Sequence, residues 1–497
     1  MSKKIKKGII WALAVILLLG SVVTVKTLTF TSKQIPVDTK VNYPIDTEQV
    51  LARVSEGIQI PTVSNAGSID YTQFTRFREF LEKSYPLVHS NLERKIINSY
   101  SLIYIWQGSN PQLKPILLMA HYDVFNVVDE NAWKYPPFSG TIADGYIWGR
   151  GMIDDKASAI GLLEAMEYLL KSGFQTTRTI YVALGQDEEG GGRQGAQKEA
   201  EYLKSQGLLF ETMIDEGMIT TKGVLPGLPD DQWITLIGTE EKGFLNLKLT
   251  ATAEGGHSSM PPRQTSIGII AQAVAKIETH PFPARWDKAT TDLLDYIGPE
   301  TEPPYRVIFA NRWLFGPILM SQFSAKPKSD SLIRTTIAPD VFNAGEQPAS
   351  MPVTASAVVN FRMLPGDTME SVTDRVRRII NDPRVSIEPI TSDEGVWETP
   401  PASTADTQSF QILSRSIREV TPDVLVTPTL MTGGSDGRYF AAEGLALSWY
   451  RILPAKIAVE DIEGVHGVDE RMLVSSYLDM VNTYIRLMSN FSEPSKN

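Results

Sequence analysis

Two short apolar runs enclose an amphipathic segment in the first half of the chain. Residues 115–120 (PILLMA) and 179–184 (TIYVAL) are bounded by polar residues, as expected for strands buried on both faces of a sheet. Between them, apolar residues recur on one helical face until Ser172-Gly173 ends the run. This order predicts a parallel crossover, and ligands usually bind beyond the carboxyl ends of such strands. The helical face consists of Ala159, Leu162, Leu163, Met166 and Leu170.

A second pattern begins near Lys242, where strand-like alternation is followed by helical spacing and then by alternation again. This order predicts a small α+β, ferredoxin-like domain inserted into a larger α/β domain with a mostly parallel sheet. The larger domain would comprise residues 45–241 and 393–497, and the inserted domain residues 242–392. Strands are expected at 244–253, 352–363 and 385–390, and helices at 266–277, 369–380, 408–420 and 474–488.

The chain begins with a basic stretch followed by an uncharged apolar stretch. Four lysines lie within residues 3–7, and residues 8–25 carry no charge. As a helix the apolar stretch is roughly 27 Å long, close to the thickness of a bilayer's hydrocarbon core. We expect residues 1–25 to anchor the protein in a membrane, with 26–44 as a polar linker and the rest outside the cytoplasm, in the periplasm or extracellular space. A cleaved signal peptide, giving a secreted protein, is the alternative, but no clear A-x-A-like site follows Leu19.

The composition of the chain limits its class, its partners and the side chains that could bind a metal. At 497 residues the chain exceeds what one hydrophobic core usually serves, and its 42% hydrophobic and 21% charged residues are near the globular average. The 58 acidic and 47 basic residues leave a net charge of −11, which argues against a nucleic-acid partner. With no cysteine in the chain, a metal site must be built from His, Asp and Glu.

Three of the five histidines lie in loop-like surroundings that contain glycines or acids: His121, His257 and His466. A single His-x-Asp after a strand is more often a hydrogen-bonded histidine than a metal ligand. A metal-binding imidazole, however, usually donates its other N–H to a carboxylate, and Asp123 is placed to accept it from His121.

Carboxylates cluster at the ends of apolar runs. Asp154 ends a glycine-rich turn and is equally well explained as a helix N-cap. Asp187, Glu188 and Glu189 repel one another unless a cation or solvent compensates, although a solvated acidic turn is an alternative. With Asp215 and the histidines, these acids match a two-metal site, in which a carboxylate that is not a ligand accepts a proton from water. Glu188 is our choice for that carboxylate.

With these motifs the chain resembles the di-zinc metallopeptidase family of aminoacylases, glutamate carboxypeptidases and carboxypeptidase S. The resemblance spans residues 45–490 and is strongest to carboxypeptidase S and the N-fatty-acyl-amino-acid synthase/hydrolases, on residues 311–315 (NRWLF) and 334–336 (RTT). It implies that the inserted domain is a lid or dimerisation domain. The shared motifs, in order, are HYD, GRGMIDDK, DEEGG, IDEG, GGHSSMPP, FRMLPGD, GGSDGR and HGVDE.

The resemblance implies two divalent metal ions, zinc in the first place, with cobalt and manganese as alternatives. Asp154, rather than Asp155, would bridge the two ions. The first ion would be bound by His121, Asp154 and Asp215, and the second by Asp154, Glu189 and His466.

The resemblance also implies roles for residues that bind no metal. Asp123 would orient His121, and Glu188 would be the general base that deprotonates water and then protonates the leaving nitrogen. His257, in the inserted domain, would stabilise the oxyanion, either within one chain or across a homodimer.

Two arginines are implied on the substrate side. Arg362 resembles the family's clamp on a free carboxylate, with a surface salt bridge as the alternative, and Arg438 lies in the GGSDGR motif. Where relatives usually have an Asn in the inserted domain, this chain has Ala349-Ser350. Large apolar residues of this domain are expected in its core, with a wall for a long acyl chain as the alternative. They are Trp286, Tyr296, Tyr305, Trp313, Leu314 and Phe315.

We therefore expect an exported metal-dependent hydrolase that cleaves an amide bond next to a free carboxylate, with metal-activated water and a Glu general base. Its substrate would be an N-acyl amino acid or a short peptide. An aminopeptidase or dipeptidase is the first alternative, but an aminopeptidase site needs an acid for the substrate's ammonium, whereas Arg362 is a cation. A non-catalytic surface protein that binds peptides is the second alternative, and such a protein usually lacks a ligand or the base.

Overall fold

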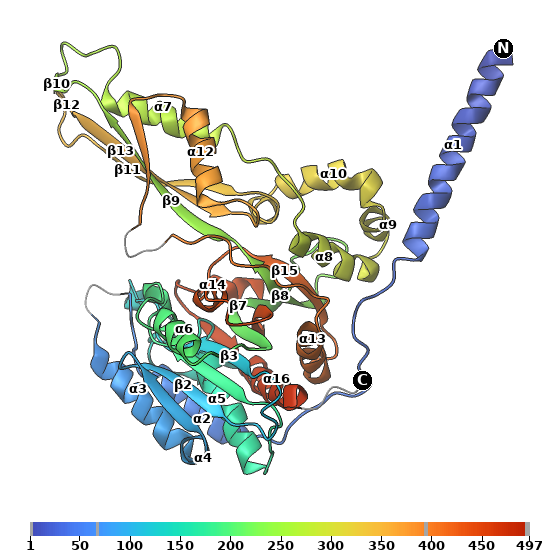
Figure 1. Ribbon diagram of the computed structural model, residues 1–497, viewed down its shortest axis with the longest axis vertical. Coiled ribbons are helices and arrows are strands. Elements are labelled where there is room, and N and C mark those ends of the chain that lie inside the picture. The colour runs from blue at the N-terminus through green and yellow to red at the C-terminus, as the bar shows by residue number, and fades with distance from the viewer. Residues whose placement is uncertain (1–2, 66–68, 392–395, 493–497) are drawn as a thin grey trace.

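An eight-stranded sheet forms the centre of the larger domain in the computed structural model, which describes residues 3–65, 69–391 and 396–492 (Figure 1). The strand order is β1-β2-β6-β3-β7-β16-β8-β15. The four central strands run parallel to one another, but β1 and β2, β2 and β6, and β7 and β8 pair antiparallel. At the other edge β8 and β15 pair in parallel, whereas β16 and β8 pair antiparallel. The sheet is therefore mixed, and the prediction of a mostly parallel sheet is met only in part, since consecutive strands such as β1 and β2 also pair directly. The strands are β1 (Glu93–Ile97), β2 (Ser101–Trp106), β3 (Ile116–His121), β6 (Ile180–Gly185), β7 (Thr212–Lys222), β8 (Trp233–Glu241), β15 (Leu425–Met431) and β16 (Trp449–Lys456).

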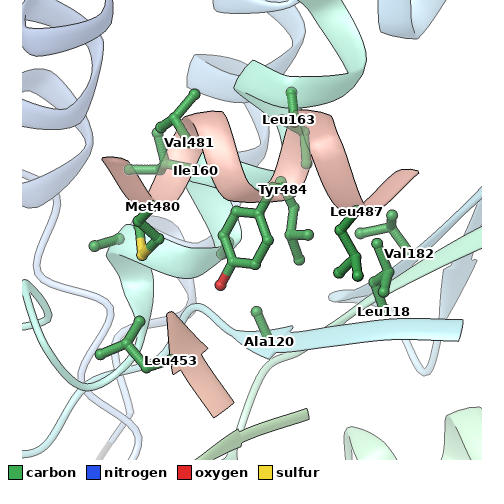
Figure 2. Packing of buried hydrophobic residues seen from close by; sticks show 14 of the residues in the cluster. Leu118, Ala120, Ile160, Leu163, Val182, Leu453, Met480, Val481, Tyr484 and Leu487 are labelled. Carbon is green, nitrogen blue, oxygen red and sulfur yellow. The ribbon is translucent and has the colours of Figure 1, made fainter. Parts of the chain in front are cut away.

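The predicted crossover is present, since β3 and β6 pair in parallel and α5 (Lys156–Lys171) precedes β6. Figure 2 shows Tyr484 and Leu487 of α16 (Val474–Ser492) packed with Ile160 of α5 and Leu118 of β3. Burial of these apolar side chains is the main force that holds the two helices on one face of the sheet. Because β3 and β6 are parallel neighbours, the loops that follow them lie at the same edge of the sheet.

A second sheet of four antiparallel strands lies in the chain between β8 and β15, apart from the first sheet (Figure 1). Its order is β11-β13-β9-β14, and alternate residues of β13 are buried, as predicted for a sheet covered on one face. With its two helices it has the β-α-β-β-α-β order of the predicted ferredoxin-like unit. The domain limits remain predictions, and the limit at 392/393 lies outside the described residues. The elements are β9 (Gly243–Thr252), α7 (Ser266–Glu278), β11 (Thr336–Ala344), β13 (Thr354–Met363), α12 (Met369–Ile380) and β14 (Val385–Pro389).

Four helices that the pattern did not predict lie between α7 and β11. Trp286, just before them, packs with Phe323 of α10 at a ring-centre distance of 5.1 Å, so core packing is confirmed for this aromatic residue. Trp313 and Leu314 of α10 are instead exposed, which contradicts the expectation of core packing for them. The helices are α8 (Lys288–Ile297), α9 (Tyr305–Ala310), α10 (Arg312–Ser324) and α11 (Pro327–Asp330).

The N-terminal helix α1 (Lys3–Leu28) projects from the globular part, and it is the one helix among the described residues that is long and apolar enough to cross a membrane (Figure 1). The predicted linker after it is held against the larger domain. The side chain of Gln34 donates to the Val426 carbonyl at 2.9 Å, and the Tyr43 N–H donates to Asn482 Oδ1 at 2.8 Å. A polar segment can form hydrogen bonds with an edge strand and a helix of the folded domain, which the sequence pattern does not reveal.

The other elements named below include two small sheets. A three-stranded sheet with the order β17-β5-β4 lies beside α16, and a two-stranded ribbon pairs β10 with β12. Their bounds are β4 (Ile142–Ala143), β5 (Tyr146–Trp148), β10 (Gly256–His257), β12 (Ser350–Met351), α13 (Gln408–Val420), α14 (Gly437–Ala442) and β17 (Arg471–Leu473).

Candidate metal centre

Side chains from four separate segments meet at the edge of the large sheet where β3 and β6 end. His121 is the last residue of β3, and Glu188 and Glu189 lie in the turn that follows β6. Asp154 lies in the loop between β5 and α5, and His466 in the loop before β17. This is the edge at which the sequence predicted chemistry, because the carboxyl ends of parallel strands meet there.

Asp154 lies between two imidazoles. Its Oδ1 atom is 3.0 Å from His121 Nε2, and its Oδ2 atom is 3.1 Å from His466 Nε2. Glu189 Oε2 is 3.0 Å from the same nitrogen of His466. Asp155 instead accepts a hydrogen bond from the backbone N–H of His121 at 3.3 Å, so Asp154 is the acid of this pair that faces both imidazoles. In the part of the chain that the structure describes, Asp154, Glu189 and His466 are the one set of three ligand atoms within 4.8 Å of one another.

Asp215, the fifth predicted ligand, lies in β7 and is buried beside this cluster. Its Oδ2 atom accepts a hydrogen bond from the backbone N–H of Gly437 at 2.7 Å. A Cβ atom at Gly437 would lie 2.9 Å from that oxygen, so glycine lets the start of α14 approach the carboxylate closely. Asp215 therefore has one oxygen engaged by the protein, and its role as a ligand remains a prediction.

Asp123 ties the turn after β6 to His121. Its Oδ1 atom accepts a hydrogen bond from the Glu188 N–H at 3.1 Å, and its Oδ2 atom accepts one from the Glu189 N–H at 3.0 Å and one from the Ser64 hydroxyl. Oδ1 is also 3.3 Å from His121 Nδ1. The buried Asp123 carboxylate thus lies against both the imidazole and the acidic turn, and the Asp123 backbone carbonyl is 3.1 Å from His121 Nδ1. The role of Asp123 in orienting His121 remains a prediction.

Glu470 is a structural member of the site that sequence reasoning missed. Its Oε1 atom accepts hydrogen bonds from the N–H groups of Gly151, Ile153 and Asp154 at 3.0, 2.7 and 3.1 Å. Its Oε2 atom is 2.6 Å from Arg150 Nη1, and both side chains are buried. The HGVDE and GRGMIDDK motifs contain these residues, but nothing in their spacing shows that the two motifs touch.

Buried acids crowd the cluster. Burial raises the pKa of Glu188 to about 8 and that of Glu189 to about 7. Burial lowers the pKa of His466, but its hydrogen bonds with Asp154 and Glu189 outweigh this and raise it to about 10. Asp155 Oδ1 is buried without a hydrogen-bond partner among the described residues. The site thus gathers several acids in buried surroundings, where divalent cations would favour their ionised forms, and imidazole with carboxylate is a donor set suited to zinc.

The two predicted substrate-side arginines lie at opposite ends of a column of stacked groups. The Arg362 guanidinium lies 4.4 Å from the centre of the Phe244 ring, and Phe244 stacks on Trp397 at 4.7 Å. The Arg438 guanidinium lies 4.7 Å from Trp397 on the way to the cluster, and its Nη1 atom is 3.8 Å from Glu188 Oε1. Because Arg362 is in β13 and Phe244 in β9, the column joins the second sheet to the acidic turn.

His257 is not near the cluster of its own chain. It lies on the β10–β12 ribbon at the tip of the second domain, remote from β3 (Figure 1). Its side chain is exposed, and its Nδ1 atom is 2.8 Å from the Ser259 hydroxyl. Ser350 is the pairing partner of His257, and Ala349 has a φ of 65°, a left-handed conformation that Asn adopts more easily than Ala. The departure from the family pattern therefore lies next to His257.

Sequence comparison finds relatives over nearly the whole chain. A probable carboxypeptidase S-like 2 of Dictyostelium discoideum is 40% identical over 476 residues, which cover 93% of this chain and 90% of the relative. The N-fatty-acyl-amino acid synthase/hydrolase PM20D1 of Homo sapiens is 36% identical over 440 residues, which cover 87% of this chain and 86% of the relative.

Solved structures share the fold at low sequence identity. The metallo-carboxypeptidase Sso-CP2 of the M20 family from Sulfolobus solfataricus has a TM-score of 0.65 at 16% identity, with 89% of this chain and 99% of that chain covered. Human carnosine dipeptidase 1 has a TM-score of 0.59 at 14% identity, with 90% and 96% covered. The model of peptidase family M20/M25/M40 matches residues 117–490. The chain therefore belongs to peptidase family M20/M25/M40 and is, as the sequence predicted, a metal-dependent hydrolase of amide bonds.

Proposed function

We propose that the protein cleaves the amide bond next to a free carboxylate in N-acyl amino acids or short peptides. This proposal rests on the position of Asp154, which has one carboxylate oxygen beside His121 and the other beside His466. Such a carboxylate can serve two cations at once. The relatives named as carboxypeptidase S-like and as N-fatty-acyl-amino acid synthase/hydrolase support the substrate class.

Two divalent ions, zinc in the first place, would be held by the residues that meet around Asp154. Bound ions would polarise the scissile carbonyl and lower the pKa of the attacking water. The residues that would hold them are His121, Asp154 and Asp215 for one ion, and Asp154, Glu189 and His466 for the other.

Glu188 accepts the proton of the attacking water and returns it to the leaving nitrogen. Its side chain keeps 17% of its surface exposed toward the site, so it can reach water, and burial raises its pKa to about 8. A raised pKa suits a group that must take up a proton and release it again near neutral pH. Arg438 lies 3.8 Å from Glu188, and its positive charge limits the rise in the pKa of Glu188. Together with Arg362, Arg438 contacts the free carboxylate of the substrate.

The chain acts outside the cytoplasm, anchored in a membrane by α1. The charge-free stretch of α1 follows four lysines, which favour the cytoplasmic side. His257 serves the site of a second copy in a homodimer, because it is exposed at the tip of the second domain and lies far from the cluster of its own chain (Figure 1).

A matched pair of variants tests the roles of the two neighbouring acids. Glu188→Gln should retain both metal equivalents and lose activity by about 10²–10⁴-fold, as expected for a general base. Glu189→Gln should lose metal as well as activity, because it removes a ligand. Metal content and turnover are measured on the same samples, and turnover close to that of the wild type in Glu188→Gln would overturn the assignment.

The substrate class is tested with three compounds: an N-acyl amino acid, the same compound with its carboxylate converted to an amide, and a dipeptide. The carboxylate form should be cleaved and the amidated form should not, because the latter cannot pair with Arg362 and Arg438. Equal kcat/KM for the two forms would refute recognition of a free carboxylate, and cleavage of the dipeptide alone would narrow the activity to a dipeptidase.

A further inference from the structure

The helix α10 has apolar side chains on its outer face as well as on its inner face. Leu319 and Phe323 point inward, where they belong to an apolar cluster with Trp286. Trp313 and Ile318 remain 50% and 57% exposed. A helix that is apolar on both sides is unusual on a water-facing surface, and an exposed apolar patch generally marks a place of contact.

The exposed residues lie where α1 meets the globular part. Asn311, the residue before α10, donates a hydrogen bond to the Thr27 hydroxyl at 3.1 Å and to the Val23 carbonyl at 3.3 Å. Arg306 of α9 donates to the Phe30 carbonyl at 3.1 Å. These contacts fix the start of α10 beside the last turns of the apolar helix, and both helices lie on the same side of the molecule (Figure 1).

The same segment is basic in an otherwise acidic chain. Residues 305–329 contain four basic side chains and no acidic one, whereas the whole chain has a net charge of −11. One of the four, Arg312, is paired with Asp295 of α8 at 2.6 Å, so three of the charges lack this compensation by α8. A basic segment with exposed aromatic and aliphatic residues is the composition of helices that lie in the interface of anionic membranes. Trp is also enriched at the depth of the lipid headgroups.

We propose that α10 lies in the outer interface of the bilayer that α1 crosses, with Trp313, Leu314 and Ile318 buried among the lipids. The proposal rests on the membrane anchoring by α1 proposed above. Three side chains would hold a free protein only weakly, but α1 keeps α10 at a high effective concentration next to the bilayer. The anchored enzyme therefore has a fixed orientation on the membrane, in place of free rotation on its linker.

The absence of cysteine makes the depth of single positions measurable in the full-length chain. The variants Ile318→Cys, Leu17→Cys and Ile96→Cys are spin-labelled and reconstituted in vesicles of phosphatidylcholine and phosphatidylglycerol. Leu17 lies in the middle of α1. Ile96 is also apolar and is 43% exposed, but it lies in β1, at one edge of the large sheet. The helix α8 packs against β15, at the other edge. Collisions of each label with oxygen, which enters lipid, and with a water-soluble nickel chelate are compared by EPR.

Oxygen collisions should dominate at Ile318 and Leu17, and nickel collisions at Ile96. Trp313→Cys gives a second position on the same face and should repeat the result for Ile318. A lipid-exposed label at Leu17 with a water-exposed label at Ile318 would overturn the proposal for α10 and leave the anchor intact. Water exposure at both would overturn anchor and proposal together. An Ile318 label shielded from both reagents, with spectral broadening from a neighbouring label, would show a protein interface and also overturn the proposal.

Discussion

The backbone N–H of Asp154 donates a hydrogen bond of 3.1 Å to Glu470, although 316 residues separate the two in the chain. Four residues before Glu470, His466 places its Nε2 atom 3.1 Å from the Asp154 carboxylate. One C-terminal loop therefore holds Asp154 through its backbone and contacts its side chain. The geometry of the candidate bridging ligand therefore depends on a loop that is more than 300 residues away in the sequence.

Glu470→Gln should lower kcat/KM by about 10–100-fold and weaken metal retention, as expected when a group that orients a ligand is lost. A glutamine amide would face either the Arg150 guanidinium or the three backbone N–H groups, and it can accept from only one side. Breaking a buried ion pair also costs about 3–5 kcal/mol of stability, so activity is measured well below the melting temperature. Glu463→Gln, at an exposed position of the same loop, is the control, and equal losses in the two variants would contradict the prediction.

Asp123→Asn should reduce kcat more than it raises KM. The amide would point its N–H groups at the N–H of Glu188 or of Glu189, and the turn that carries the proposed base would shift. We expect a loss of about 10–100-fold in kcat. Ser64→Ala removes only the hydroxyl donor to Asp123 and should have a clearly smaller effect, so a larger loss in Ser64→Ala would contradict this account.

If His257 acts in the site of a second copy, two variants that are inactive alone should restore activity when they form a heterodimer. In a heterodimer of His257→Ala with Glu188→Gln, one site has an intact Glu188 and receives an intact His257 from its partner. Equal co-expression gives half heterodimers, each with one working site, and hence about a quarter of the wild-type activity. If His257 acted within its own chain, both sites of the heterodimer would lack a group and the mixture would remain inactive.

The buried carboxyl group of Glu240 should make the stability of the protein depend on pH. Burial raises the pKa of this carboxyl to about 7, above its ordinary value of 4.5, with a further contribution from Asp287. The folded protein therefore keeps a proton that the unfolded chain releases between pH 4.5 and 7, and stability falls as pH rises through that window. Glu240→Gln should melt at a higher temperature than the wild type at pH 8, by the equivalent of up to about 3 kcal/mol, with a small difference at pH 5. A difference in melting temperature that does not change with pH would contradict the assignment.

Periodicity alone located several elements, including the two strands at whose ends the site lies. The predicted strands 115–120 and 179–184 correspond to β3 and β6, and the predicted helices 369–380 and 408–420 to α12 and α13 with the same bounds. Burial of one face gives the two helices a period in the sequence, and burial of both faces gives the two strands a continuous apolar run. Among the missed helices, α10 is apolar on both faces and shows no such contrast, and α9 and α11 have only six and four residues, too few for a period to show. The amphipathic pattern of α8 was present in the sequence and was overlooked.

The sequence by itself determined which residue types are available for metal chemistry, because a chain without cysteine has only imidazole and carboxylate to offer and places them after apolar strands. The family resemblance already favoured Asp154 over Asp155, but only the tertiary structure showed that Glu470 holds the Asp154 backbone and that His257 lies far from the cluster. Hydrophobic patterns record whether a side chain is buried, since burial repeats along one element. Contacts between loops hundreds of residues apart depend on how the elements pack, and no local pattern contains that information.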